Sequence, residues 1–247
     1  NDLVRRQGGT DEQSKWSALN SSFYQGKFKK YSANLANKSY ILKIQQKDYP
    51  DLPAMEYLCN QVAEYVDLNV PPYVYILFEN KLPTFVCENF MQFQQSSNLI
   101  HIYHFMENPD EYNCEKLYQI ILEKTERFRD GYRFVELTLF DGLLGNHDRH
   151  GRNIALIQSP NGYTLSPFYD NPCYLGLEDE LLLTAQHEPR GKIATSATAD
   201  PTLRDYIKEW QRLGCIEVVA NFEKKINIEE IIKIIDKSFI SPKRKEA

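Results

Sequence analysis

The sequence lacks the patterns typical of membrane proteins, thiolate metal sites and proteins whose main partner is nucleic acid. No apolar run approaches the length of about 20 residues that a membrane-spanning helix needs, and no signal-peptide pattern opens the chain. The five cysteines form no CxxC pair, so we expect reduced structural thiols rather than a metal site. The net charge of -5 gives no basic excess. Together these absences favour a cytoplasmic protein that makes no direct contact with a membrane.

The sequence also has no internal repeat, no low-complexity segment and no glycine-rich phosphate loop. Neither a GxGxxG nor a Walker A pattern occurs anywhere in the chain. What it does have is 247 residues of ordinary globular composition, with 42% hydrophobic and 26% charged residues. A chain of this length buries a substantial core, either as one domain or as two closely packed lobes.

Strand patterns dominate the first third of the chain, and helix patterns dominate the rest. Apolar residues recur at helical spacing from Pro53 to Val66, between the second and third strand-like runs. Those runs cover residues 27–29, 39–44, 74–78 and 84–90, with turns expected at 34–38 and 80–81. Further on, helices are expected from about 113 to 144, at 201–213 and at 228–238, with a hairpin at 153–165 and a loop at 171–200.

This order predicts an α+β fold of two lobes. The small β-rich N-terminal lobe should cover residues 1–92, and the larger α-helical C-terminal lobe should cover residues 93–247. The polar segment at 91–97 suits the connection between them.

The most informative stretch is residues 145–153, which read GNHDRHGRN and are followed beyond the predicted hairpin by Asp170. An Asp, an Asn five positions later and a second, distant Asp have the spacing of a kinase phosphoryl-transfer site. Asp148 is expected to act as the base that orients the attacking hydroxyl and accepts its proton. Asn153 and Asp170 offer the hard oxygen ligands that Mg²⁺ prefers. The sequence therefore predicts an ATP-dependent kinase with the two-lobed fold of protein kinases.

Each of these residues also has an ordinary structural interpretation, which the sequence leaves open. Asp148, Asn153 and Asp170 are all common residue types in turns, where their side chains bond to the backbone. Arg149 and His150 belong to the predicted catalytic group, but they are less specific. Arg149 is expected to pair with a phosphate or with a carboxylate of the long loop, and His150 either to touch a phosphate or to brace the catalytic loop.

A lysine inside a predicted strand points to the nucleotide. Lys43 lies between apolar residues, and an ammonium group that faces inward there needs an anion such as the α- and β-phosphates of ATP. Glu56, in the first turn of the next helix, is a candidate ion-pair partner, although acidic residues also favour first turns because of the helix dipole. The alternative for Lys43 is a solvated strand face. The adenine ring is expected to face the backbone of residues 86–89.

These segments resemble the HipA-like serine/threonine kinases, the toxin kinases of bacterial toxin–antitoxin modules. The matches follow the order of the family from about residue 20 to 171: SFYQGKF at 22–28, LPAMEYLC at 52–59, FVCENF at 85–90, GNHDRHGRN at 145–153 and LSPFYDN at 165–171. The resemblance implies further ATP-binding residues besides Lys43 and Glu56. They lie in the family's phosphate-covering loop, which corresponds to residues 22–28, and in its hinge strand, which corresponds to residues 85–90: Ser22, Gln25, Lys27, Glu88 and Phe90.

The resemblance implies ATP, Mg²⁺ and transfer of phosphate to Ser or Thr of a protein, with aminoacyl-tRNA synthetases among the substrates of such kinases. It also implies an antitoxin partner, through which nucleic acid is contacted only indirectly, and autophosphorylation of a loop serine. The candidates here are Ser21 and Ser22, and Phe23 stands where the family usually has Gly. Little room precedes the loop for the extra N-terminal subdomain of larger members, so the compact HipT-type members are the nearer resemblance.

Three rival interpretations remain. The DRHxxN string also occurs in phosphoinositide kinases, but residues 178–180 and Glu188 make the predicted loop acidic rather than suited to an anionic membrane. A secreted effector kinase would carry the same catalytic residues. An inactive pseudokinase that serves as a binding module is a rival of another class, and the complete set of Lys43, Asp148, Asn153 and Asp170 argues against it.

Overall fold

The computed structural model describes most of the chain, and four predicted site residues lie outside the part it describes. The described residues are 3–6, 30–92, 94, 96–108, 112–173 and 188–246. Outside them lie Ser21, Ser22, Gln25, Lys27 and the predicted strand at 27–29.

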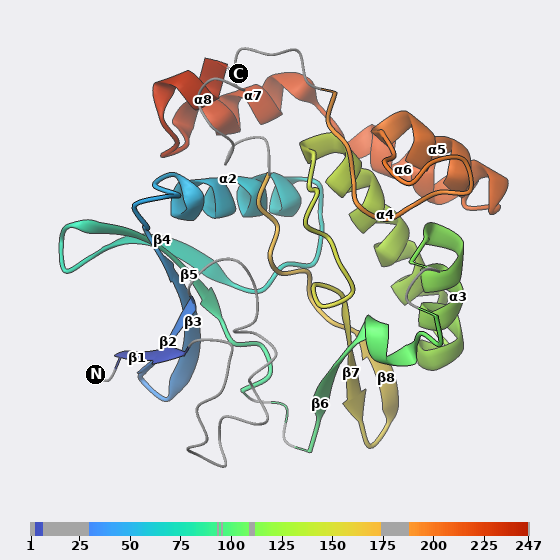
Figure 1. Cartoon of the computed structure of the whole chain (residues 1–247), viewed down its shortest axis with the longest axis horizontal. Coiled ribbons are helices and arrows are strands. Elements are labelled where there is room, and N and C mark those ends of the chain that lie inside the picture. The colour runs from blue at the N-terminus through green and yellow to red at the C-terminus, as the bar shows by residue number, and fades with distance from the viewer. Residues whose placement is uncertain are drawn as a thin grey trace.

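A five-stranded antiparallel sheet forms the N-terminal lobe (Figure 1). Its strands are β1 (Leu3–Arg6), β2 (Lys30–Leu35), β3 (Lys38–Ile44), β4 (Tyr73–Phe78) and β5 (Leu82–Glu88), in the order β1-β2-β3-β5-β4. Strands β2 and β3 join through Ala36 and Asn37, whose φ angles of 49° and 61° are those of the hairpin turn that matches strand twist. Glu79 and Asn80, with φ of 51° and 57°, connect β4 to β5 in the same way.

One helix packs on this sheet. Helix α2 (Leu52–Tyr65) starts with Pro53 in its first turn and packs against β3, β4 and β5. Its buried face carries Met55, Leu58 and Val62 at helical spacing. Glu56 is buried beside them, so an acidic side chain points towards the sheet.

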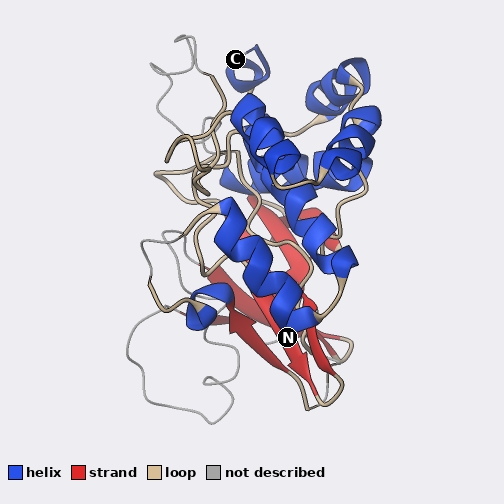
Figure 2. Ribbon diagram, turned by 90° about the vertical axis from the view of Figure 1, so that its right-hand side faces the viewer, coloured by secondary structure: helices blue, strands red, loops and turns tan. Residues whose placement is uncertain are grey.

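The C-terminal lobe combines helices with a three-stranded antiparallel sheet of order β6-β7-β8. The sheet consists of β6 (Asn98–His101), β7 (Ala155–Ser159) and β8 (Gly162–Leu165), and a short 3-10 helix, η2 (Ile102–Phe105), follows β6. The helices are α3 (Cys114–Thr125), α4 (Phe128–Leu144), α5 (Leu203–Arg212), α6 (Ile216–Lys225), α7 (Ile228–Lys237) and α8 (Pro242–Glu246). In Figure 2, helices of this lobe lie in front of the strands. None of the described helices is long and apolar enough to cross a membrane.

The structure confirms the predicted α+β architecture, with five described elements that the sequence did not predict: β1, β6, η2, α6 and α8. Strand β1 lies in a stretch without strand periodicity, β6 follows the predicted connector, and α6 falls between two predicted helices. The main hydrophobic core runs without interruption from α2 through the helices of the C-terminal lobe. The Trp210 indole N–H donates to Thr138 at 2.6 Å, and Trp210, Thr138 and the adjacent Phe134 are fully buried.

Candidate active site

The end of helix α4 presents the predicted catalytic loop. Gly145 has φ of 73°, a left-handed conformation that glycine adopts without strain, and its N–H donates to the Asp141 carbonyl at 2.9 Å. The buried Asn146 side chain donates to the Asp141 carboxylate at 3.0 Å and accepts the N–H of Asp148 at 3.1 Å. The backbone of Asp148 is therefore fixed, while its carboxylate is 45% exposed and accessible to a substrate.

Arg149 is completely buried behind this loop, and all five of its N–H donors are used. Two bonds go to the Asp141 carboxylate, at 2.8 and 3.0 Å, in a bidentate pair. The others go to the carbonyls of Asn153 and Tyr169, at 3.4 and 2.8 Å, and to the side chain of Asn171 at 2.7 Å. A guanidinium group has five such donors, so none remains for a phosphate.

Arg149 therefore connects the catalytic loop to the segment that carries Asp170. Burial alone would lower the pKa of its guanidinium, but the Asp141 carboxylate raises the pKa overall, so the charge is retained. The sequence placed Arg149 in the catalytic group, against a phosphate or a carboxylate of the long loop. In the structure its carboxylate partner is on α4 instead, and the geometry is that of a positioning residue.

Asn153 is bonded back to Asp148 across the catalytic loop. Its side-chain N–H donates to the Asp148 carbonyl at 2.8 Å, and the residue is buried. Because the amide nitrogen is tied to the loop, the amide oxygen is the end available to a ligand.

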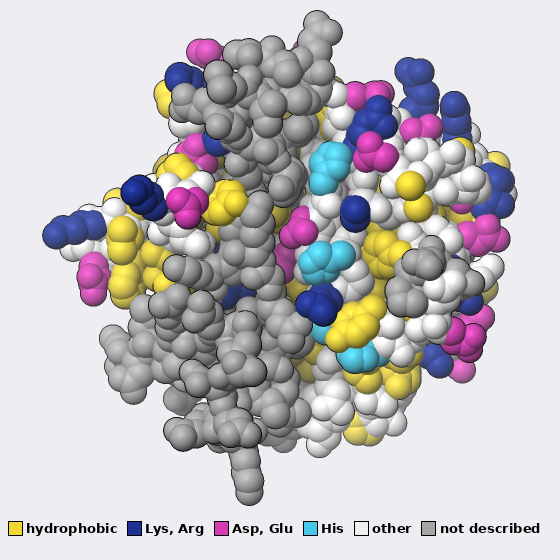
Figure 3. Space-filling view, viewed as in Figure 1, with side chains coloured by type: hydrophobic (Ala, Val, Ile, Leu, Met, Phe, Trp, Pro, Cys, Tyr) yellow, Lys and Arg dark blue, Asp and Glu magenta, His cyan; other side chains and the backbone are white. Residues whose placement is uncertain are grey.

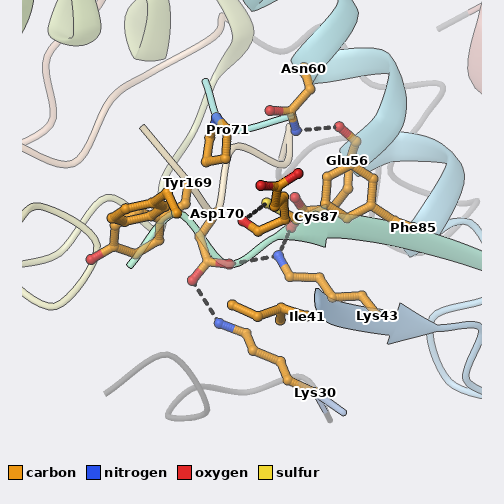
Figure 4. Close-up of a pocket in the computed structure, with 12 residues that line it drawn as sticks. Lys30, Ile41, Lys43, Glu56, Asn60, Pro71, Phe85, Cys87, Tyr169 and Asp170 are labelled. Atoms are coloured by element: carbon orange, nitrogen blue, oxygen red, sulfur yellow. Dashed lines mark hydrogen bonds and ion pairs between the residues drawn. The ribbon is translucent and has the colours of Figure 1, made fainter. Parts of the chain in front are cut away.

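Asp170 lies between two lysines that come from the N-terminal lobe (Figure 4). Its carboxylate oxygens accept from Lys30 on β2 and from Lys43 on β3, both at 2.7 Å. Burial alone would raise the pKa of Asp170, but the two ammonium groups lower it overall, so the carboxylate stays ionised. Its φ of 53° is uncommon for a residue other than glycine, and such strain is found most often at functional sites.

The predicted ion pair between Lys43 and Glu56 is present and buried on both sides. Burial by itself would lower the pKa of Lys43, but Asp170 and Glu56 together raise it, so the ammonium stays charged. The next turn of α2 adds Asn60, which donates to the Glu56 carbonyl at 2.8 Å and accepts from Asn171 at 3.3 Å. Helix α2 is thus bonded directly to the segment after Asp170.

Five of the predicted ATP-binding and metal residues line one pocket between the lobes: Lys43, Glu56, Glu88, Phe90 and Asp170. An apolar cluster at its mouth joins Ile41 of the sheet to Phe90 of the connector and Tyr169 beside Asp170. The Phe90 and Tyr169 rings lie 6.0 Å apart. Only about 30 Å³ of the pocket is open, and both Lys30 and Lys43 reach into it towards Asp170. Entry of a nucleotide therefore requires these side chains to move.

Comparison with known proteins shows the family and the fold of the chain. Residues 11–239 match the family described as the HipA-like C-terminal domain. The chain belongs to this family. A crystal structure of CtkA, a proinflammatory kinase of Helicobacter pylori, matches with a TM-score of 0.71 and 19% identity, over 90% of this chain and 85% of CtkA. HipA of the Shewanella oneidensis MR-1 toxin–antitoxin system, in complex with HipB and operator DNA, matches with a TM-score of 0.52 and 14% identity, over 95% of this chain and 68% of HipA.

These matches confirm both the family that the motifs predicted and the kinase-like fold. No curated protein sequence matched the chain.

The oxygen donors of this HipA-like site suit Mg²⁺. Asp170 supplies an ionised carboxylate and Asn153 a neutral amide oxygen. Mg²⁺ usually takes one or two carboxylates from the protein and further oxygens from phosphates and water. Within the described part of the chain, no three His, Cys, Asp or Glu side chains gather into a metal-binding group. The donor set therefore fits a metal held jointly with a nucleotide better than a metal held by protein alone.

The histidines near the site differ in exposure. His150 is 41% exposed, its ring nitrogen Nδ1 accepts the Arg152 N–H at 3.2 Å, and its Nε2 lies 3.9 Å from the Asp148 carboxylate. His101 lies deeper, and burial, with the nearby charge of Arg152, lowers its pKa to about 4. The predicted bracing role of His150 is thus compatible with its bond to the loop backbone.

The sequence missed Lys30, Asn60 and Asp141, all of which contact the predicted residues directly. Lys30 directly follows residues 7–29, which lie outside the described part of the chain, and nothing in the local sequence distinguishes it from its neighbour Lys29. Asp141 did carry a signal, because it is an acidic residue on a helix whose other residues are mostly apolar. Glu88, predicted for ATP, bonds to Lys38 and Gln92, both at 3.0 Å, at the edge of the pocket.

Proposed function

We propose that this protein is an ATP-dependent protein kinase of the HipA-like type. The observation that carries the proposal is the meeting of three segments at Asp170. Lys43 and the Glu56 behind it reach Asp170 from the N-terminal lobe, and Arg149 bonds to the backbone just before it from the catalytic loop. Lys43 and Asp170 line the pocket between the lobes, whereas Asp148 and Asn153 lie on the catalytic loop that Arg149 bonds to the segment of Asp170. Together these residues would supply the phosphate-binding lysine, the base and the two metal-ligand oxygens that phosphoryl transfer requires.

In the proposed reaction, Asp148 accepts a hydrogen bond from the hydroxyl of the substrate and takes its proton. The hydroxyl oxygen forms a bond to the γ-phosphorus of ATP, the bond from that phosphorus to the β–γ bridging oxygen breaks, and ADP leaves with the bridging oxygen. Lys43 binds the α- and β-phosphates, and Glu56 keeps its ammonium group in place. Mg²⁺, held by Asp170 and Asn153, would neutralise phosphate charge as it develops.

Asp148 tests this assignment. Asp148→Asn keeps the size and the backbone bonds of the loop but removes the base, so transfer of radiolabelled phosphate from ATP to protein should fall by about 10²-fold or more. Asp236→Asn, on the exposed side of α7, makes the same chemical change outside the site and should leave transfer unchanged. Circular dichroism should show both variants folded. Equal transfer by Asp148→Asn and the wild-type protein would remove Asp148 from the role of base.

The acceptor is proposed to be Ser or Thr of a protein that serves translation, such as an aminoacyl-tRNA synthetase. Membership of the HipA-like family supports a protein acceptor of this kind. The complex of the Shewanella HipA with HipB and operator DNA supports a DNA-binding antitoxin partner. Parallel assays with protein and with phosphoinositide vesicles separate a protein kinase from a lipid kinase. Mass spectrometry after incubation with ATP tests Ser21 and Ser22, and phosphate found only elsewhere would exclude them.

A second candidate is an effector kinase that acts on proteins of a host. The similarity to CtkA favours it, because that match covers 85% of a kinase described as proinflammatory. A toxin should arrest the growth of bacteria that express it without a partner protein, whereas an effector should leave their growth unchanged.

A further inference from the structure

A second groove lies beside the catalytic loop. It has a volume of about 420 Å³, and its walls come from η2 and the residues after it, from the catalytic loop and from the end of the long loop. Its lining includes three aromatic or apolar side chains, Tyr103, Met106 and Tyr112, and three basic ones, His150, Arg152 and Lys192. In Figure 3, histidine, Lys/Arg and hydrophobic side chains lie close together just to the right of the grey residues in the middle of the view.

The charge of the groove is opposite to that of the whole chain. No Asp or Glu of the described residues lines it, although the chain carries a net charge of -5. Arg152 and Lys192 are both exposed, and no ion pair of either is found in the described structure. The Arg152 guanidinium lies 5.9 Å from the centre of the Tyr103 ring, which places the charge directly over an apolar wall. Such a groove attracts an anionic group that is attached to an apolar one.

Two residues that line the groove, His150 and Arg152, contact residues of the proposed active site. His150, in its wall, lies 3.9 Å from the carboxylate of Asp148. Tyr169, which lines the nucleotide pocket, donates from its hydroxyl to the Arg152 carbonyl at 3.2 Å. A polypeptide that offered its hydroxyl to Asp148 would therefore extend next into this groove.

The groove is held in shape by the catalytic loop itself. The hydroxyl of Tyr112 donates to the Arg149 carbonyl at 3.0 Å, and the Tyr103 N–H faces the Gly151 carbonyl at 3.5 Å. A Cβ atom added at Gly151 would lie 3.0 Å from Cβ of Tyr103, so glycine permits this close approach. The aromatic wall and the proposed base thus keep a fixed separation.

We infer that this groove binds the segment of a protein substrate that flanks the phosphorylated Ser or Thr, and that it selects an acidic side chain there. The inference rests on the proposed kinase function and adds the substrate class to it. Arg152 and Lys192 would pair with the carboxylate, while Tyr103 and Met106 would contact the apolar part of the same segment. Both basic side chains lie outside the set that would bind nucleotide and metal.

The test is phosphorylation of paired peptides by the full chain. Each pair has one central Ser and differs only by Glu or Gln at one of the four positions on either side. We expect one or two positions at which Glu raises the specificity constant by about five-fold, the size of an exposed ion pair. The gain should appear mainly in the KM for peptide and should shrink at high salt.

Charge variants make the test specific. Arg152→Gln and Lys192→Gln should each reduce the preference for Glu, and Lys192→Glu should reverse it in favour of Lys at the same position. Lys224→Gln, which neutralises an exposed lysine on α6, is the matched control and should keep the preference. The KM for ATP should stay the same in all of these variants.

The outcomes distinguish this inference from the proposed function. No transfer to any peptide or protein would overturn the kinase assignment and the groove together. Transfer that is equal with Glu and Gln at every position would overturn the groove alone. If Lys192→Gln phosphorylates the neutral peptide faster than the wild-type protein does, Lys192 would bind an inhibitory segment of the chain itself, such as the acidic residues 178–180. That result would also overturn the inference.

Discussion

At the scale of single residues, Asp170 is the point on which the site depends. It has two lysine partners, and the proposed function requires it to bind a metal as well. Lys30 holds one of its oxygens and Lys43 holds the other, each at 2.7 Å. Since Lys43 also pairs with Glu56, Lys30 is the partner that can leave Asp170 more easily. If Asp170 binds a metal as proposed, Lys30 would compete with that metal for the carboxylate.

Lys30→Met tests this competition. It should lower the free energy of unfolding by about 1.5–3 kcal/mol, since a charge-assisted hydrogen bond to a buried carboxylate is lost. It should also lower the Mg²⁺ concentration needed for half-maximal ATP binding, because Asp170 gains a free oxygen. Thermal unfolding and Mg²⁺ titrations measure the two effects.

The control for this change is Lys38→Met. Lys38 pairs with Glu88 at 3.0 Å, but its side chain is 46% exposed, so its loss should change stability less than Lys30→Met does. An unchanged requirement for Mg²⁺ in Lys30→Met would contradict the competition.

The ionisation of Asp170 predicts a pH dependence of stability. Its pKa in the folded protein lies below the ordinary value, because Lys30 and Lys43 outweigh burial. The folded state therefore binds this proton less readily than the unfolded chain does, where the pKa is about 3.9. The contribution to stability is complete above that value and is lost as the pH falls below it.

Asp170→Asn removes this contribution. The variant should be less stable than the wild-type protein near neutral pH, and the difference between the two should shrink as the pH falls from about 5 to about 2. Urea unfolding at several pH values measures the difference. A gap that stays constant over this range would show that Asp170 carries no such charge.

The predicted and the missed residues differ in how far away their partners lie along the chain. Asp148 and Asn153 are five positions apart, and the distance to Asp170 is set by one hairpin, so the sequence alone showed the pattern. Lys30 is buried because of a carboxylate 140 residues later, and no local pattern records that. Arg149 was found, but its role was not, because only the fold shows that Asp141 takes up its charge.

At the scale of elements, the C-terminal segment holds the start of helix α2. Asp51, at the N-terminus of α2, makes no capping bond within the helix, and its carboxylate accepts instead from Arg244 at 2.7 Å and from Ser241 at 3.2 Å. Phe239 stacks on Tyr75 of β4 with the ring centres 4.5 Å apart. Because α2 carries Glu56, these contacts fix the helix that orients Lys43 (Figure 1).

Arg244→Ala should therefore affect both stability and transfer. The lost bond to a carboxylate should lower the free energy of unfolding by about 1–3 kcal/mol. Phosphate transfer should fall several-fold in kcat, with a smaller change in the KM for peptide, because none of the groove's lining residues lies on α2. Calorimetry and steady-state kinetics measure these changes.

Lys245→Ala is the control on the same helix, since Lys245 donates to the Asp236 carbonyl of α7 rather than to α2. A loss of stability in Arg244→Ala with unchanged kcat would mean that the C-terminal segment stabilises the fold but does not position the Lys43–Glu56 ion pair.

The sequence predicted those helices and strands whose own residues carry a periodic apolar pattern or a capping signal. Helix α2 has apolar residues at helical spacing and a proline in its first turn. Strand β6 has four residues and exists because it pairs with β7, more than 50 positions later, so no local signal predicts it. Helix α6 did carry a signal, since its buried Val218, Val219 and Phe222 have helical spacing, but the segment is only ten residues long.

At the scale of the whole molecule, the two lobes share a core and meet again at the pocket. The main hydrophobic cluster includes residues of α2 together with those of α3 to α6. A second, small cluster joins Ile41 of the N-terminal sheet to Phe90, Leu99 and Tyr169. A nucleotide seated at this second cluster would contact both lobes, so its binding should stabilise the entire chain.

ATP with Mg²⁺ should therefore raise the melting temperature of the protein. At a concentration of ATP 100 times its Kd, the gain is about 2.7 kcal/mol, which corresponds to roughly 5–10 °C for a chain of this size. In the wild-type protein, Mg²⁺ should increase the shift beyond that of ATP alone, because in the proposed site Asp170 and Asn153 would hold the metal against the phosphates. In Asp170→Asn, ATP should still stabilise the protein through the pocket walls, but Mg²⁺ should add little. If Mg²⁺ adds as much in the variant as in the wild type, the metal is bound elsewhere, and the joint site between the lobes is wrong.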